Sequence, residues 1–143
     1  MYLGLDYGTS EIKALLIDAA GNIVHTHGVS LSIQRPQPHW SEQSAAEWWQ
    51  ATNDLMAAMR EKSGNHWQQI KAIGLSGQMH GAVLLDAADN VLRPVILWND
   101  TRSAAECAEL ETAVPNLHTI TGNLAMPGFT APKLLWVAKH EPE

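Results

Sequence analysis

The chain has 143 residues, of which 45% are hydrophobic and 17% charged, a balance typical of one globular domain and too apolar for a disordered chain. Its 15 acidic residues exceed its 9 Lys and Arg, and the net charge of −6 argues against nucleic acid or an anionic membrane as the main partner. The single cysteine, Cys107, permits no internal disulfide and fits a reducing, cytoplasmic setting. No signal-peptide pattern opens the sequence, and no apolar run approaches the ~20 residues of a membrane span.

The first part of the sequence predicts strands joined by tight turns. Apolar side chains alternate with other residues over residues 2–6, 11–18 and 23–33. In the last of these segments, the alternation places Ile23 on the same face as Val29. Strands joined by such short turns are antiparallel, so we expect a three-stranded meander.

Helices and strands are predicted to alternate in the rest of the chain. Ser44 and Glu47 have the spacing of a capping box, in which each side chain bonds the backbone N–H of the other. The remaining predicted elements are a helix from this box to residue 62, strands 70–76 and 82–86, a helix over 101–112 and a helix from residue 130. The sequence therefore predicts an α/β domain with a mixed sheet.

The stretch from Asp6 to Lys13 has the composition of a phosphate site. Asp6 ends an apolar strand, and Gly8 with the hydroxyl residues Thr9 and Ser10 forms the turn into the next strand. Glycine lets backbone N–H groups approach an anion, the hydroxyls add donors, and Lys13 adds positive charge. Carboxylate oxygen also suits a hydrated Mg²⁺. The alternative from these residues alone is an ordinary hairpin whose turn is capped by Asp6.

The spacing Asp6-x-Gly8-Thr9-Ser10-x-x-Lys13 resembles the phosphate-binding signature of the superfamily of actin, heat-shock chaperones and sugar kinases. Within it, the chain resembles the FGGY carbohydrate kinases, and among them the xylulokinase branch. Six stretches carry this resemblance in order along the chain: residues 40–43, 48–50, 77–81, 93–100, 121–123 and 126–136. The resemblance implies a ribonuclease-H-like, actin-like ATPase fold, with residues 1–143 as a partial N-terminal kinase domain.

The resemblance also implies a reaction, in which the γ-phosphoryl group of ATP is transferred to the 5-hydroxyl of D-xylulose. Asp6 is then expected to hold Mg²⁺ through water and to orient the phosphates. The residues expected along the phosphate path are Gly8, Thr9, Ser10 and Lys13. ATP and Mg²⁺ are the cofactors that this reaction needs.

The residues that bind the sugar are expected in loops that follow strands, because α/β sheets bind their ligands at these loops. The candidate substrate-binding residues are Gln78, Met79, His80, Asn99, Asp100 and Phe129. Met79 and His80 are implied by the resemblance as the pair that contacts the sugar, and Phe129 as a residue near it. From the residues alone, the favoured interpretation of His80 is an ordinary hydrogen-bonded loop histidine, and that of at least one of Asn99 and Asp100 is a cap of the helix that follows.

No segment matches the Gly-rich stretch with an Asp that supplies the general base in the family, so the isolated chain is expected to be inactive. Glu11 departs from the small or neutral residue that relatives commonly carry there, and it would repel phosphate if it points toward the nucleotide. Two alternatives stay open: a non-catalytic sugar-binding or assembly module, and a kinase for another sugar such as ribulose or glycerol. The sequence also leaves open whether the protein is a homo-oligomer.

Overall fold

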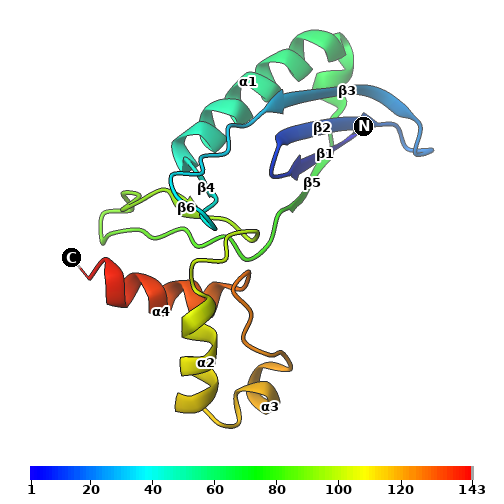
Figure 1. The fold of residues 1–143 in the computed structure, drawn as a ribbon. Helices are drawn as coiled ribbons and strands as arrows, with labels where there is room; N and C mark the ends of the chain where they lie inside the picture. The colour runs from blue at the N-terminus through cyan, green and yellow to red at the C-terminus, as the bar shows by residue number, and fades with distance from the viewer. Residues whose placement is uncertain (143) are drawn as a thin grey trace. The chain divides into compact units, whose positions relative to one another are not determined.

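The computed structural model describes residues 1–142 and folds into two compact units (Figure 1). The sheet unit comprises residues 1–33 and 44–78. The helical unit comprises residues 34–43 and the chain from residue 79 onward. No helix in the described part of the chain is long and apolar enough to cross a membrane.

The sheet unit contains a four-stranded mixed sheet and one long helix. Its elements are β1 (Tyr2–Tyr7), β2 (Glu11–Ile17), β3 (Ile23–Ser30), α1 (Ala45–Ser63), the 3-10 helix η1 (Gly64–Gln69) and β5 (Ala72–Gly77). The strand order is β3-β2-β1-β5. The first three strands pair antiparallel, as predicted, and β5 pairs parallel with β1 after the α1 crossover.

One face of this sheet packs against α1 and forms the core. The core consists of apolar side chains from the sheet and from α1. The sheet contributes Leu3, Leu5, Ile12, Ala14 and Leu16, and α1 contributes Ala51, Leu55 and Met59. The alternation predicted for β1 and β2 is thereby confirmed, and the apolar residues at helical spacing in α1 face the sheet. The prediction for Ile23 is wrong, because a register shift between Leu16 and Ile17 breaks the alternation in β3 and leaves Ile23 65% exposed.

The N-terminus of α1 forms half of the predicted capping box. The Ser44 hydroxyl accepts a hydrogen bond from the Glu47 backbone N–H at 3.3 Å. The Glu47 carboxylate accepts from the Ser32 backbone N–H at 2.8 Å. The reciprocal bond to Ser44 is therefore replaced by one that ties the chain after β3 to the helix.

The helical unit has little sheet. Its elements are β4 (Glu42–Gln43), β6 (Val95–Ile96), α2 (Ala104–Ala113), α3 (Leu117–Thr121) and α4 (Thr130–His140). The predicted strand over 82–86 is wrong: this segment makes only isolated bridges, Ala82 with Ile96 and Leu85 with Val91. Two turns repeat a motif, since Asp86 accepts from backbone N–H groups of the residues that follow it as Asp18 does in the β2–β3 turn.

A buried arginine organises the helical unit. The Arg102 guanidinium lies 2.6 Å from the Asp100 carboxylate and 2.8 Å from that of Glu42. It also lies over the Trp40 ring, 3.7 Å from the ring centroid. Trp136 of α4 packs edge-on against Trp40, with 5.4 Å between the ring centroids. These contacts join β4, the loop before α2 and the α4 helix around one charge.

The packing of α1 makes a direct prediction. Replacing the fully buried Leu55 with Ala should lower the free energy of unfolding by about 2–5 kcal/mol, because apolar contact is lost and a cavity remains. Urea denaturation of the chain measures this change. Trp49→Ala on the same helix is the control, since Trp49 is 69% exposed and should change stability little. Equal effects of the two substitutions would contradict the assigned helix face.

Candidate functional site

Strand pairing brings Asp6 and Lys13 together in the sheet unit. The two residues are direct partners in the β1–β2 register, so their side chains share one face of the sheet. That face is opposite the one that packs on α1, and both side chains are exposed. Between them, the turn passes so close to β2 that a Cβ on Gly8 would lie 2.9 Å from the Glu11 carbonyl oxygen. The predicted phosphate residues therefore form one compact hairpin.

Glu11 points to the same face as Asp6 and Lys13. Its carboxylate lies 2.8 Å from the Lys13 ammonium group. The hydrogen bond and charge of Glu11, with a smaller contribution from Asp6, raise the pKa of Lys13 above its usual value. Sequence reasoning left the orientation of Glu11 open, and in the structure its carboxylate lies on this face and pairs with Lys13.

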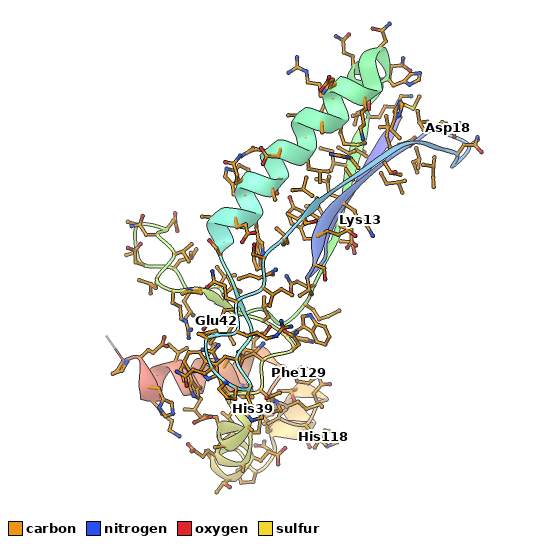
Figure 2. The ribbon with its side chains drawn as sticks, turned by 45° about the horizontal axis from the view of Figure 1, so that its top comes forward. Lys13, Asp18, His39, Glu42, His118 and Phe129 are labelled. Carbon is orange, nitrogen blue, oxygen red and sulfur yellow. The ribbon has the colours of Figure 1, made fainter. Side chains whose placement is uncertain are left out.

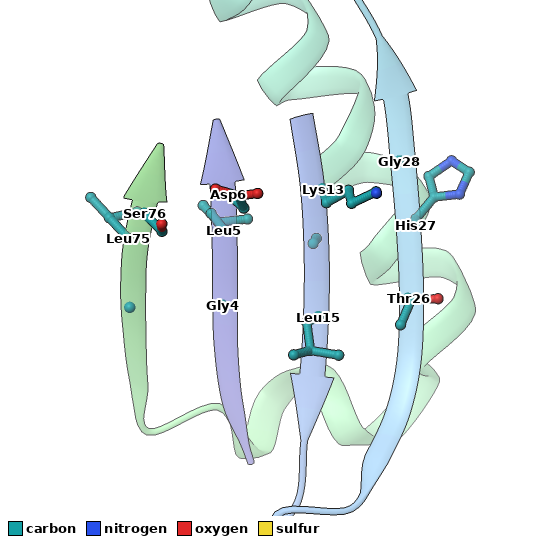
Figure 3. Close-up of a pocket in the computed structure, with 12 residues that line it drawn as sticks. Gly4, Leu5, Asp6, Lys13, Leu15, Thr26, His27, Gly28, Leu75 and Ser76 are labelled. Carbon is teal, nitrogen blue, oxygen red and sulfur yellow. The ribbon is translucent and has the colours of Figure 1, made fainter. Parts of the chain in front are cut away.

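A groove of about 570 Å³ follows this face of the sheet (Figure 3). Part of its wall is bare backbone, at the glycines Gly4, Gly28 and Gly74. The polar side chains in its wall are those of Asp6, Lys13 and Ser76. In Figure 3 the Lys13 amine extends toward β3 at Gly28, while Asp6 lies on the neighbouring strand β1. Figure 2 shows Lys13 among the side chains of the same sheet. The groove offers a cation, a carboxylate and a hydroxyl within one open surface.

Gln78 is hydrogen-bonded to the β1–β2 hairpin. Its backbone N–H donates to the Tyr7 carbonyl oxygen at 2.8 Å. The Thr9 hydroxyl lies 3.3 Å from the Gln78 side-chain oxygen, to which it donates. Gln78 is thus the last residue of the sheet unit, and the predicted sugar residues Met79 and His80 belong to the helical unit.

The His80 loop, residues 79–81, is held at the start of α4. The His80 ring packs on the Phe129 ring, with 4.5 Å between the ring centroids. The His80 carbonyl oxygen accepts hydrogen bonds from the Lys133 amine at 2.7 Å and the Thr130 hydroxyl at 3.3 Å. Met79 is 62% exposed beside them. The loop therefore presents an imidazole and a thioether from a fixed backbone.

Lys133 is completely buried, and sequence reasoning gave it no role. Burial lowers its pKa from 10.5 to about 8, with the charge of Arg102 adding to the shift and that of Asp100 opposing it. Its sequence context, a lysine between Pro132 and Leu134 in an apolar helix, gives no sign of burial, because long lysine side chains usually reach solvent.

The two residues that follow Trp98 have different surroundings. Asp100 is buried, and its carboxylate accepts from the Ser41 backbone N–H at 2.6 Å as well as from Arg102. These bonds engage both of its oxygens, and the role of Asp100 in sugar binding stays a prediction. Asn99 is exposed and lines a second cavity together with Arg35 and Thr101. Neither residue is the N-cap of α2, which is Ser103, but the Asp100 carboxylate accepts a hydrogen bond from the Arg102 backbone N–H at 2.9 Å in the turn that leads into this helix.

The fold agrees with the comparison to known protein families. The sequence profile of the FGGY family of carbohydrate kinases, N-terminal domain, matches residues 1–143. The chain belongs to this family. Its mixed α/β architecture is that of the actin-like ATPase fold of sugar kinases.

Several of the individual relatives are xylulose kinases. The xylulose kinase of Escherichia coli (strain K12) is 54% identical over 143 residues, covering 100% of this chain and 29% of the relative. That of Bacillus subtilis (strain 168) is 39% identical over 99% of this chain and 28% of the relative. Among solved structures, a xyloylose kinase from Brucella ovis superposes with a TM-score of 0.94 at 56% identity, over 99% of this chain and 30% of that one. The chain spans less than a third of the length of these relatives.

The lowered pKa of Lys133 predicts a pH-dependent stability. Between pH 8 and 10 the unfolded chain binds more protons at this residue than the folded chain does, so the folded state gains stability as pH rises. Relative to Lys133→Met, the free energy of unfolding should rise by about 2 kcal/mol over this range. Urea denaturation at several pH values measures the difference.

Lys139→Met is the matched control on the same helix. Lys139 is exposed and its hydrogen bonds to Glu109 and Glu106 raise its pKa, so its contribution stays constant between pH 8 and 10. Parallel pH profiles for the wild-type chain and Lys133→Met would contradict a buried lysine with a lowered pKa.

Proposed function

We propose that this chain supplies the phosphate-binding hairpin and part of the sugar site of an ATP-dependent kinase that converts D-xylulose to D-xylulose 5-phosphate. The observation that carries the proposal is the pairing of Asp6 with Lys13 across a glycine turn, which puts a carboxylate and an ammonium group at one open surface. The xylulose kinases among the relatives support the choice of sugar. Residues 1–143 are proposed to form a partial N-terminal domain of that enzyme.

On the phosphate side, each residue has a role that its position allows. Lys13 neutralises charge on the transferring group, which is the main requirement of phosphoryl transfer. Gly8 lets the backbone approach the phosphates, and Thr9 and Ser10 offer hydroxyl donors next to it. Thr9 is oriented by its hydrogen bond to Gln78, which thereby acts on the phosphate side.

The Asp6 carboxylate is a suitable ligand for a magnesium ion. It presents an exposed carboxylate beside Lys13, and no cluster of three or more His, Cys, Asp or Glu side chains that could hold a metal ion occurs within residues 1–142. A single carboxylate with water and phosphate oxygens is a usual way of binding Mg²⁺. When bound, the ion would offset the negative charge of the phosphates and orient them.

On the sugar side, His80 provides a hydrogen-bonding ring and Met79 an apolar wall. Phe129 supports the His80 ring from one side. Asn99 is a further candidate for a sugar hydroxyl, on a different surface of the same unit. No segment of residues 1–143 matches the Gly-rich stretch with an Asp that supplies the general base in the family, so we propose that the base for the 5-hydroxyl comes from outside these residues.

The alternative is a non-catalytic module that binds a sugar or a partner with the same fold, and a third candidate is a kinase for ribulose or glycerol. The short Asp6–Lys13 hairpin with its donors favours catalysis over pure binding, because a binding module has no need of a phosphate site. The cytoplasmic location, and whether the protein is a homo-oligomer, stay predictions.

Steady-state kinetics test the proposed reaction. The full-length protein that carries these residues should phosphorylate D-xylulose with ATP, in preference to ribulose and glycerol. The isolated chain should show no turnover, and Asp6→Asn in the full-length protein should lower kcat by at least about 100-fold. Turnover by the isolated chain would contradict an external base, and a full-length protein inactive on every sugar would favour the binding module.

The position of Glu11 makes a separate prediction about ATP. Because Glu11 holds Lys13 and adds negative charge, Glu11→Ala should lower the KM for ATP by about two- to fivefold. The KM for D-xylulose should not change. Glu61→Ala, which removes an exposed carboxylate from α1, is the control for net charge. A higher KM for ATP in Glu11→Ala would show instead that Glu11 assists nucleotide binding.

A further inference from the structure

The backbone at His80 has a conformation that its side chain does not favour. Its φ angle is 63°, in the left-handed region that residues other than glycine rarely adopt. Such a residue keeps this conformation only when its surroundings hold it there, and residues of this kind are common at functional sites. The contacts that hold His80 therefore decide where its imidazole ring points.

The main contact of the His80 backbone is with the side chain of Lys133. The lysine amine donates to the His80 carbonyl oxygen at 2.7 Å and to the Gly128 carbonyl oxygen at 2.9 Å. It thereby links the His80 loop to the segment that leads into α4. That segment is itself tightly packed, because a Cβ on Gly128 would lie 2.6 Å from the Trp98 carbonyl oxygen.

Stability does not explain why a lysine occupies this position. Within residues 1–142 no carboxylate lies within ion-pair distance of the Lys133 amine, so its direct partners are the two carbonyl oxygens, and the Asp100 charge acts on it only from a longer distance. A buried charge without an ionic partner is costly, and an apolar side chain of similar length would avoid that cost. A group kept at the expense of stability indicates a role in function.

We propose that Lys133 is the positioning residue of the sugar site: it fixes the His80 backbone in its left-handed conformation and so aims the His80 ring at the sugar. Thr130 assists by donating to the same carbonyl oxygen, and Phe129 supports the ring. All three residues lie at the start of α4, so one helix end controls the loop. This inference rests on the proposed sugar-binding role of His80.

The test uses Lys133→Met in the full-length protein, with Lys139→Met as the matched control on the same helix. Lys133→Met should raise the KM for D-xylulose about tenfold or more, with the KM for ATP within about twofold of wild type. Lys139→Met should change neither constant, since Lys139 pairs with Glu106 and Glu109 at the surface. A loss of folded protein would lower the apparent kcat and leave both KM values unchanged, so the KM for the sugar separates positioning from stability.

A double-mutant cycle with His80→Ala shows whether Lys133 acts through His80. If it does, adding Lys133→Met to His80→Ala should raise the KM for D-xylulose no further. Independent, multiplying effects would overturn the proposal, as would an unchanged KM in Lys133→Met. If Lys133→Met fails to fold, Thr130→Val provides the second variant, and it should raise the same KM by a smaller factor. A wild-type protein inactive on D-xylulose would refute the proposed function, whereas an active one with insensitive variants would refute only the positioning role.

Discussion

The helical unit depends on one buried charge, the guanidinium group of Arg102. A guanidinium leaves water at a high cost, which is offset here by two carboxylates and by the face of Trp40. These partners come from the loop before α2, from β4 and from the Trp40 segment, so the burial of Arg102 requires the three segments to come together. Trp136 then packs on Trp40 and fixes α4 by the same cluster. Because α4 carries Lys133, the position of the His80 loop follows from the burial of Arg102.

The two candidate recognition elements are built in different ways. The phosphate hairpin is local: strand register alone pairs Asp6 with Lys13, and the close turn at Gly8 completes it. The His80 loop is assembled from segments about 50 residues apart in sequence, which tertiary packing must bring together. A local element forms wherever its two strands pair, whereas the loop is sensitive to every contact that positions α4. Substitutions that loosen the packing of the helical unit should therefore weaken sugar binding more than phosphate binding.

This difference also explains how much could be predicted from the sequence. The meander, α1 and the hairpin follow local patterns of alternation, capping and turn residues, and they were predicted correctly. Ile23 was misplaced because a register shift leaves no mark in the alternation. The burial of Lys133 and Asp100 could not be predicted, since charged residues are normally exposed and only distant partners make their burial tolerable. The segment over 82–86 has the apolar pattern of a strand but lacks a continuous neighbour to pair with.

The central claim is that the Asp6–Lys13 hairpin binds the phosphates and the His80 loop binds the sugar. The most direct measurement is a crystal structure of the full-length protein with D-xylulose, Mg²⁺ and a non-hydrolysable ATP analogue. The account predicts a sugar hydroxyl within about 3.2 Å of the His80 ring, and the terminal phosphate beside Lys13 with Glu11 turned away from it. A sugar bound elsewhere while the His80 ring faces solvent, or phosphates that leave the Glu11–Lys13 pair intact, would contradict it.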